Sequence, residues 1–317
     1  MRTDLRSLRA AAPVIALAFF AAAGFQDADA QDASKYYTVQ HPDQFKIDWG
    51  AFYRQADAMT AAVRAELPHY LNLPYGPNVK ERLDLYLPKD KPTSAPVFLF
   101  FHGGGFREGD RAQYGFVAKP FAERGVIVAV ASYRLTADGF KYPDQPQDAR
   151  LALAWLYKHI AQYGGDPNRL FVGGHSAGAI LTADLGVNRK WMQGAGIPES
   201  ALRGILPISG PYDLRTHGRP GEEDVYAPTT ELQVKASPIL HIDDPAPVAL
   251  VAVGSTESYV SSSQALANQI TAAGARATFL SLEGEDHRDT VHDIGDGNSA
   301  LAKAAIDMIS KAPPASH

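Results

Sequence analysis

From residue 97 onward, short apolar runs alternate with longer stretches of helical periodicity, and this alternation most limits the possible folds of the chain. The runs are rich in β-branched and aromatic residues, as is typical of strands buried on both faces of a sheet. The predicted strands cover residues 97–101, 126–131, 170–172, 205–208, 248–253 and 277–282, and the predicted helices cover 112–124, 145–163, 177–188, 261–273 and 299–310. Strands and helices in this order indicate a largely parallel sheet with helices on both faces. The chain is therefore predicted to be an α/β protein.

The remaining segments complete one predicted domain. Apolar residues recur at helical spacing over about 48–67, and Pro68 ends this N-terminal helix. Residues 82–87 alternate polar with apolar side chains like a half-exposed strand. Residues 211–246 have no clear periodicity and are rich in Pro, Thr and acidic residues, so we expect an insertion over the sheet. Residues 31–317 are thus predicted to form a single domain, which is long enough to bury a large core.

The first thirty residues have the pattern of a secretory signal peptide. Three arginines within the first nine residues are followed by an uncharged apolar run over residues 10–25, and Ala28 and Ala30 occupy the two positions that a signal peptidase reads. The alternative is a membrane anchor, but this run is short for a membrane span. We therefore expect cleavage after Ala30, export to the periplasm or the exterior, and no stable membrane association of the mature protein.

Composition excludes several classes of function. The chain contains no cysteine, which rules out disulfides, thiol catalysis and cysteine-ligated metals. Its net charge of −5 gives no basic excess to neutralise phosphates, so a nucleic acid is not an expected partner. Hydrophobic residues make up 45% and charged residues 21%, which is ordinary for a globular protein.

A Gly-His-Ser-Ala-Gly sequence at 174–178 stands between a predicted strand and a predicted helix. This is the context of a nucleophile elbow, in which a sharp strand-to-helix turn exposes a serine hydroxyl. Side chains at the flanking positions would clash in so tight a turn, and Gly174 and Gly178 have none. The sequence therefore predicts Ser176 as a nucleophile, with the amide of Ala177 pointing outward beside it. The alternative is a tight glycine turn that contains a serine by chance.

The sequence His-Gly-Gly-Gly at 102–105 follows the first strongly apolar strand. Consecutive glycines allow the backbone to turn its N–H groups toward a ligand. The amides of Gly104 and Gly105, together with that of Ala177, are therefore predicted to form an oxyanion hole. The alternatives are a flexible loop or a phosphate cradle, although a P-loop would need a Lys followed by Ser or Thr after the glycines.

A serine nucleophile needs a base, and His287 is the best candidate. It comes directly after the last predicted strand, at the edge of the sheet where the elbow lies. His175 adjoins the serine, but we expect its side chain to point away from the hydroxyl around the turn. His102 precedes the glycine loop and is expected to fix that loop by hydrogen bonding.

A carboxylate must then orient the imidazole and stabilise its cation. In proteins of this architecture with a nucleophile elbow, the chain order is serine, acid, histidine, which places the acid just after the strand at 248–253. Glu257 is the acidic residue of that loop. Its alternative role is a solvated loop charge, and Asp243, Asp244 and Asp286 are the alternative acids.

Together these residues resemble a known family. The pairing of the motifs at 102–105 and 174–178 resembles the α/β-hydrolase esterase/lipase branch typified by hormone-sensitive lipase. Further segments that resemble such enzymes are 132–135, 142–148 and 163–169. The segment 208–214, Ile-Ser-Gly-Pro-Tyr-Asp-Leu, is similar to one in kynurenine-formamidase-like and bacterial feruloyl-esterase-like hydrolases. The resemblance covers roughly residues 70–310.

The resemblance implies the same site as the motifs do. The implied residues are Ser176 as nucleophile, His287 as base, Glu257 as acid, and Gly104, Gly105 and Ala177 as oxyanion donors. Two positions depart from the family pattern. The acid of the relatives is usually Asp, so Glu257 requires a slightly retracted loop. Phe106 stands where Trp or Tyr often follows the glycines, which changes the pocket shape more than the mechanism.

The predicted function is a serine carboxylesterase that acts on a small-molecule ester through an acyl-enzyme, with no metal or organic cofactor. One alternative is an arylformamidase or amidase that uses the same triad. The segment 208–214 favours it, whereas the predicted export argues against it, since tryptophan catabolism is cytoplasmic. A second alternative is a catalytically silent binding protein on the same scaffold. Tyr212, Tyr226 and Tyr259 are candidate pocket residues, but nothing in the sequence names the acyl or alcohol group, and the oligomeric state stays open.

Overall fold

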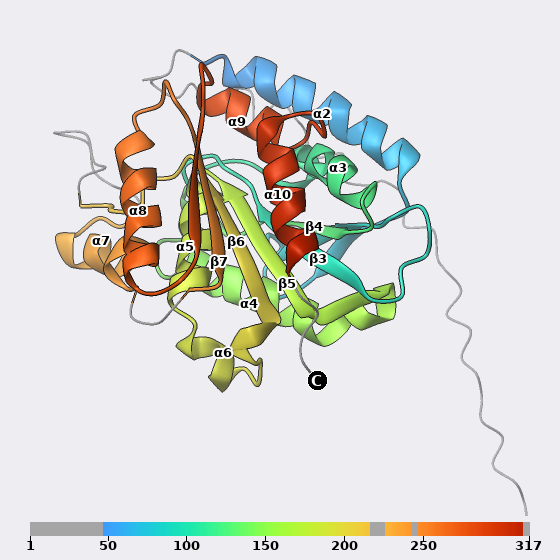
Figure 1. Cartoon of the computed structure of the whole chain (residues 1–317), viewed down its shortest axis with the longest axis horizontal. Helices are drawn as coiled ribbons and strands as arrows, with labels where there is room; N and C mark the ends of the chain where they lie inside the picture. The colour runs from blue at the N-terminus through green and yellow to red at the C-terminus, as the bar shows by residue number, and fades with distance from the viewer. Residues whose placement is uncertain (1–46, 216–225, 243–245, 313–317) are drawn as a thin grey trace, which may run out of the picture.

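The computed structural model describes residues 47–215, 226–242 and 246–312 (Figure 1). The predicted signal peptide and its cleavage site lie outside these residues, as does part of the predicted insertion. In the described part of the chain, no helix is both long and apolar enough to cross a bilayer.

Eight strands of the described residues form one sheet, in the order β1-β2-β4-β3-β5-β6-β7-β8. The strands are β1 (His69–Pro74), β2 (Arg82–Tyr86), β3 (Ala95–Phe101), β4 (Ile127–Ala131), β5 (Gly165–His175), β6 (Leu202–Ile208), β7 (Val248–Gly254) and β8 (Ala277–Leu282). β2 pairs antiparallel with β1 and β4, and the other pairings are parallel. The predicted largely parallel α/β fold is confirmed, with an antiparallel edge that the alternation did not indicate.

Helices cover both faces of the sheet (Figure 1). They are α2 (Trp49–Glu66), α3 (Ala118–Ala122), α4 (Asp144–His159), α5 (Ala177–Val187), α6 (Lys190–Gly194), α7 (Thr230–Ala236), α8 (Val260–Ala272), α9 (His287–Asp293) and α10 (Ala300–Lys311). Side chains of α4, α5 and α8 pack on one face, and side chains of α2, α3, α9 and α10 pack on the other. Each face therefore has its own hydrophobic core.

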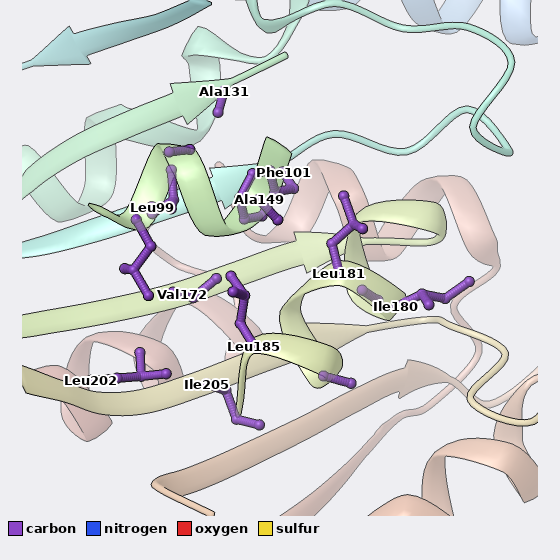
Figure 2. Packing of buried hydrophobic residues seen from close by; sticks show 14 of the residues in the cluster. Leu99, Phe101, Ala131, Ala149, Val172, Ile180, Leu181, Leu185, Leu202 and Ile205 are labelled. Atoms are coloured by element: carbon purple, nitrogen blue, oxygen red, sulfur yellow. The ribbon is translucent and has the colours of Figure 1, made fainter. Parts of the chain in front are cut away.

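Alternation along the strands supplies both cores. On β3, Leu99 and Phe101 point to one face, whereas Phe98 and Phe100 point to the other. Figure 2 shows the first face, where Leu181 and neighbouring residues of α5 pack against the strands. The near-continuous apolar runs of the sequence are explained by this two-sided burial.

Three local features differ from the predictions. The helix expected over 112–124 is a pair of 3₁₀ turns followed by the short α3. Pro120 lacks an amide hydrogen and fits only the first turn of a helix, so α3 cannot begin much earlier than residue 118. No helix was predicted directly after β8, but α9 begins at His287 itself, with Asp286 as its N-cap. α7 lies in the predicted insertion, where no helix was expected.

Candidate active site

Ser176 occupies a sharp turn between β5 and α5. Its backbone has φ 55° and ψ −116°, a conformation that L-residues rarely adopt. A Cβ at Gly174 would lie 2.3 Å from the Gly178 carbonyl oxygen, and a Cβ at Gly178 would lie 2.2 Å from the Phe101 carbonyl oxygen. The two glycines are therefore required by the turn, as the motif predicted, and the serine is held at the N-terminus of α5.

Glu257 and His287 are brought together at the ends of β7 and β8. The His287 Nδ1–H donates to Glu257 Oε2 over 2.6 Å, and both residues are buried. The second carboxylate oxygen, Oε1, accepts from the Gly254 amide at 2.8 Å and from Ser209 Oγ at 2.6 Å. A neutral ring that donates through Nδ1 has its lone pair on Nε2, the tautomer that a base needs. The carboxylate is thus fixed by three donors, one of which is the imidazole.

Among the alternative acids, Asp286 has another role. The Asp286 carboxylate accepts from the amides of Arg288 and Asp289 and caps α9. Asp243 and Asp244 fall outside the described residues.

Ser209 is a site residue that the sequence reasoning did not single out. It follows β6 with a φ of 55°, a strained conformation for a residue with a side chain. Its hydroxyl contacts Glu257 and also lies 3.0 Å from Thr290 Oγ1, which in turn lies 3.1 Å from the His287 carbonyl oxygen. The only signal in the sequence was the resemblance of the segment 208–214, which named no role for this serine.

The start of α9 lies beside the elbow. His175, the residue before Ser176, has its Nε2 2.8 Å from the His287 carbonyl oxygen, and the two rings are 4.4 Å apart. The imidazole of His287 is therefore close to the end of the strand that carries the serine.

The glycine loop lies against the same elbow. A Cβ at Gly103 would be 3.2 Å from Ser176 Cβ, so no side chain fits between them. Gly104 and Gly105 have φ values of 112° and 59°, which glycine adopts without strain. Within the described residues, the amides of Gly104, Gly105 and Ala177 have no hydrogen-bond acceptor. The predicted oxyanion donors thus retain N–H groups that a ligand could use.

His102 fixes this loop, as predicted. Its Nδ1 lies 2.7 Å from the Gly103 carbonyl oxygen, and its own carbonyl accepts from the Tyr133 hydroxyl at 2.8 Å. The rings of His102 and Tyr133 stack at 4.4 Å. Burial lowers the pKa of His102 from 6.5 to about 4, so the ring is neutral near neutral pH.

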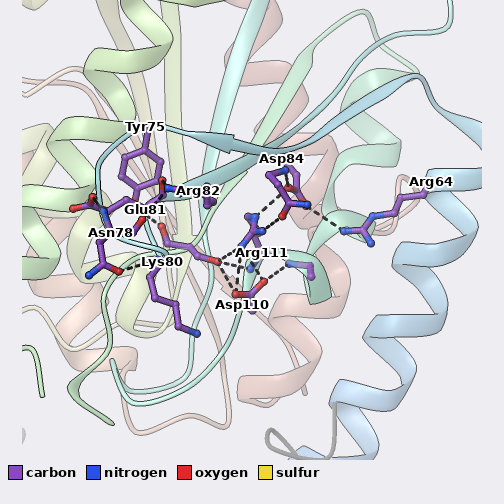
Figure 3. Close-up of polar contacts among 12 residues, drawn as sticks. Arg64, Tyr75, Asn78, Lys80, Glu81, Arg82, Asp84, Asp110 and Arg111 are labelled. Carbon is purple, nitrogen blue, oxygen red and sulfur yellow. Dashed lines mark hydrogen bonds and ion pairs between the residues drawn. The ribbon is translucent and has the colours of Figure 1, made fainter. Parts of the chain in front are cut away.

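A buried network of charges supports the far end of the loop (Figure 3). Arg111 donates through Nε to Asp84 Oδ1 at 3.1 Å and through Nη1 to Asp110 Oδ1 at 3.3 Å. Asp110 Oδ2 accepts from Ser132 Oγ at 3.1 Å, and Asp84 Oδ2 accepts from Arg64 Nη2 at 3.1 Å. Buried charges need such partners, and here the partners come from α2, β2 and the loop. No sequence motif predicted this network.

Aromatic rings surround the site. Trp49 and Tyr259 approach the His287 ring edge-on, with centroids 6.0 and 5.4 Å away. Tyr226 stacks on Phe106 at 3.9 Å. Tyr212 is completely buried and belongs to the same hydrophobic core as Tyr226. Trp49, the first residue of α2, was not among the predicted pocket residues.

A family model described as BD-FAE matches residues 83–270, which is more than half of the chain. The chain belongs to the BD-FAE family. The matched part of this BD-FAE protein contains the glycine loop, Ser176 and Glu257, and it ends before His287.

Curated proteins and solved structures agree with this membership. A probable isoprenylcysteine alpha-carbonyl methylesterase of Arabidopsis thaliana is 30% identical over 238 residues, which are 68% of this chain and 50% of the plant protein. A kynurenine formamidase of Danio rerio is 26% identical over 261 residues, which are 80% of this chain and 86% of the fish protein. The structure of EstE1, a thermostable carboxylesterase from a metagenomic library, is 26% identical with a TM-score of 0.67, covering 83% of this chain and 96% of its own. The BD-FAE protein is a carboxylesterase-like α/β-hydrolase that spans half the length of its plant relative.

Proposed function

We propose that this BD-FAE family member is a serine carboxylesterase with Ser176 as nucleophile, His287 as base and Glu257 as the acid that orients it. The observation that carries the proposal is the 2.6 Å bond between His287 Nδ1 and Glu257 Oε2 beside the strained elbow serine. Nucleophile, base and orienting acid are the groups that an acyl-transfer enzyme requires. The similarity to EstE1 supports ester hydrolysis.

The reaction follows from these roles. Ser176 Oγ attacks the ester carbonyl carbon while His287 Nε2 takes the hydroxyl proton, and Glu257 stabilises the imidazolium that forms. The negative oxygen of the tetrahedral intermediate accepts from the amides of Gly104, Gly105 and Ala177, and each such donor lowers the barrier by about 3–4 kcal/mol. His287 then protonates the departing alkoxide, and the acyl-enzyme remains. A water molecule repeats the sequence and releases the acid.

The decisive experiment replaces the nucleophile. Ser176→Ala should reduce kcat for p-nitrophenyl acetate by on the order of 10⁴–10⁶-fold, because no other group can form the acyl-enzyme. A fluorophosphonate probe should label the wild type once per chain and should not label the variant. Ser94→Ala, at an exposed serine after β2, is the matched control and should keep full activity and labelling. Persistent turnover by Ser176→Ala would exclude the proposal.

Formamide hydrolysis is the second candidate, because this chain covers 86% of the Danio rerio kynurenine formamidase. Ser176, assisted by the same base and acid, would attack a formyl carbon, and the leaving group would then be an amine. Measuring kcat/KM for p-nitrophenyl acetate and for N-formylkynurenine side by side decides between the two. We expect the ester to be the better substrate, and a higher kcat/KM for the formamide would reverse the assignment.

We further propose that residues 1–30 direct export and are removed. The arginine-rich start, the apolar run and the small residues at 28 and 30 support this. Expression of the full chain with a C-terminal tag, followed by N-terminal sequencing of the exported protein, should give Gln31 as the first residue. A protein that stays in the cell with an intact N-terminus would contradict the proposal.

A further inference from the structure

His175 is a buried histidine that the proposed mechanism does not use. It is the last residue of β5 and is 1% exposed. Its Nε2 lies 2.8 Å from the carbonyl oxygen of His287, which can only accept. Nε2 must therefore carry the proton, and Nδ1 is left as a bare acceptor. No hydrogen-bond partner for Nδ1 is found among the described residues. One hydrogen bond, from Nε2–H to the backbone of the proposed base, therefore fixes the tautomer of His175.

The ring contacts the base and the glycine loop and adjoins the nucleophile. It adjoins Ser176 in sequence, and its centroid is 4.4 Å from that of His287. A Cβ at Gly103 would lie 2.9 Å from His175 Nδ1, so the glycine loop packs directly on the ring. One side chain therefore connects the strand that holds the nucleophile with the backbone of the base and with the oxyanion loop.

We propose that His175 is a positioning residue, whose Nε2–H holds the His287 carbonyl and thereby fixes the base relative to Ser176. This inference rests on the proposed function. His287 is the first residue of α9, so its backbone lies at the N-terminus of this short helix. Its carbonyl accepts from His175 and also from Thr290 Oγ1 at 3.1 Å. A displacement of a reacting group by about 1 Å can cost on the order of 100-fold in rate, which is why such a contact matters.

The neutral state of His175 suits this role. Burial, and after it the neighbouring His287, lower the pKa of His175 well below its ordinary value. His175 therefore stays uncharged when His287 takes the serine proton. A second cation at this distance would oppose formation of the imidazolium, so a neutral donor is what the position requires.

The test compares two replacements of nearly equal length. His175→Gln places an amide N–H close to the original Nε2, whereas His175→Met fills a similar volume and cannot donate. We expect His175→Met to lower kcat for p-nitrophenyl acetate by about 10- to 100-fold, with KM changed by less than about 3-fold. His175→Gln should retain kcat within about 3-fold of wild type, since it restores the donor. The rate of fluorophosphonate labelling should follow kcat in both variants.

Two further readouts separate positioning from packing. The low-field proton resonance of the His287 Nδ1–H should persist in His175→Gln and shift or broaden in His175→Met. Thermal unfolding of both variants shows whether the folded state is retained. If His175→Met does not fold, His175→Leu takes its place, because it also removes the donor to this carbonyl and should lower kcat by about 10- to 100-fold.

The outcomes are distinct from those of the proposed function. Wild-type kcat in His175→Met, or equal losses of kcat in the Gln and Met variants, would overturn the positioning role while the esterase assignment stands. In the fallback, unchanged kcat in His175→Leu would do the same. Activity that survives Ser176→Ala would instead remove the proposed function itself.

Discussion

Two regions of the site are built by different physical means. The histidine corner, made of Ser209, Glu257, His287 and Thr290, is joined by short hydrogen bonds around a single carboxylate. The loop corner, made of Asp84, Asp110, Arg111 and Ser132, is joined by ion pairs among several buried charges. The histidine corner orients a group that reacts in the proposed mechanism. The loop corner holds a loop whose backbone amides would bind the negative oxygen of the intermediate.

Their places in the sheet explain the difference. The histidine corner lies at the carboxyl ends of the parallel strands β6, β7 and β8, where open α/β sheets gather ligand-binding groups. The loop corner lies at the antiparallel edge, where β2 and α2 cover the segment after β3. In the proposed mechanism, the parallel strand ends supply the reacting groups, while the antiparallel edge supplies rigidity. Substitutions at the first should therefore cost activity, and substitutions at the second should cost mainly stability.

The largest expected effect is on activity at the histidine corner. Glu257→Gln keeps the shape of the acid but offers an N–H to the ring, which favours the wrong tautomer of His287. By analogy with the corresponding change in serine proteases, kcat should fall by on the order of 10³–10⁴-fold. Steady-state kinetics with p-nitrophenyl acetate measure this, and urea unfolding should show a much smaller change. Glu257→Asp, which keeps the charge but shortens the reach to Gly254 and Ser209, should lose less. An active Glu257→Gln enzyme would show that the acid lies elsewhere.

The next effect is on stability at the loop corner. Asp84 is 1% exposed and accepts from Arg111, Arg64 and the Asn72 amide. Asp84→Ala leaves the buried Arg111 without this partner, and breaking a buried ion pair typically costs about 3–5 kcal/mol. Urea unfolding monitored by circular dichroism should show this loss, with kcat of the folded variant reduced by much less than in Glu257→Gln.

An exposed ion pair is the matched control for Asp84→Ala. Glu231 and Lys235 pair on the surface of α7, and Glu231→Ala should leave the unfolding midpoint within error. Should Asp84→Ala instead abolish kcat with an unchanged unfolding midpoint, the division of labour between the two corners would be wrong.

The sequence was sufficient to predict that Glu257 and His287 lie close together, because both are tied to strand ends. The elbow motif, the apolar run at 248–253 and the last strand predicted where Ser176, Glu257 and His287 would converge. The structure brings Glu257 and His287 into contact and places both beside the elbow. Ser209 escaped notice because a serine after a strand has many ordinary roles, and its value depends on a strained φ that no local pattern encodes.

The loop corner could not be predicted in the same way. Asp84 reads as the polar half of a half-exposed strand, yet α2 and the 3₁₀ turn at Arg111–Gln113 bury it completely. β1 was missed because a register shift between Tyr70 and Leu73, with Asn72 at φ 60°, interrupts its alternation. These features arise from contacts between segments far apart in the chain. Local periodicity carries no information about such contacts, since each partner looks like a solvated side chain in its own segment.

A smaller effect tests how the acid is held within the histidine corner. Ser209→Ala removes the hydroxyl that donates to Glu257 Oε1 at 2.6 Å and leaves the His287 contact in place. A hydrogen bond to a charged group contributes about 1.5–3 kcal/mol, but the Gly254 amide still holds the same oxygen, so we expect kcat to fall by only about 10-fold. Ser209→Gly is the control for strain, because glycine adopts the positive φ freely; it should lose the same activity and unfold at a higher temperature than the alanine variant. Unchanged kcat in both would mean that the carboxylate needs no hydroxyl partner.

The smallest effect concerns the pH dependence of His102, a buried residue whose pKa is influenced by Asp110 and Arg111 of the loop corner. His102 has its pKa lowered to about 4 by burial, the largest cause, while Asp110 raises it and Lys80 and Arg111 lower it. Between about pH 6.5 and pH 4, His102 is protonated in the unfolded chain but remains neutral in the folded protein. The free energy of unfolding is therefore unaffected by this group above about pH 6.5 and decreases as the pH drops below that value. The limiting slope for one such group is about 1.4 kcal/mol per pH unit.

His102→Gln should remove this slope and keep a donor near the Gly103 carbonyl. Urea unfolding at pH 8, 6.5 and 5 should show wild-type stability falling more steeply than that of the variant over the acidic interval. Asp148, whose pKa burial raises to about 6, acts in the opposite direction in both proteins, so only the difference between the two slopes isolates His102. Parallel slopes would mean that folded His102 takes up its proton as readily as the unfolded chain does. The loop corner would then be open to water rather than closed around its charges, and the contrast between the two corners would lose its physical basis.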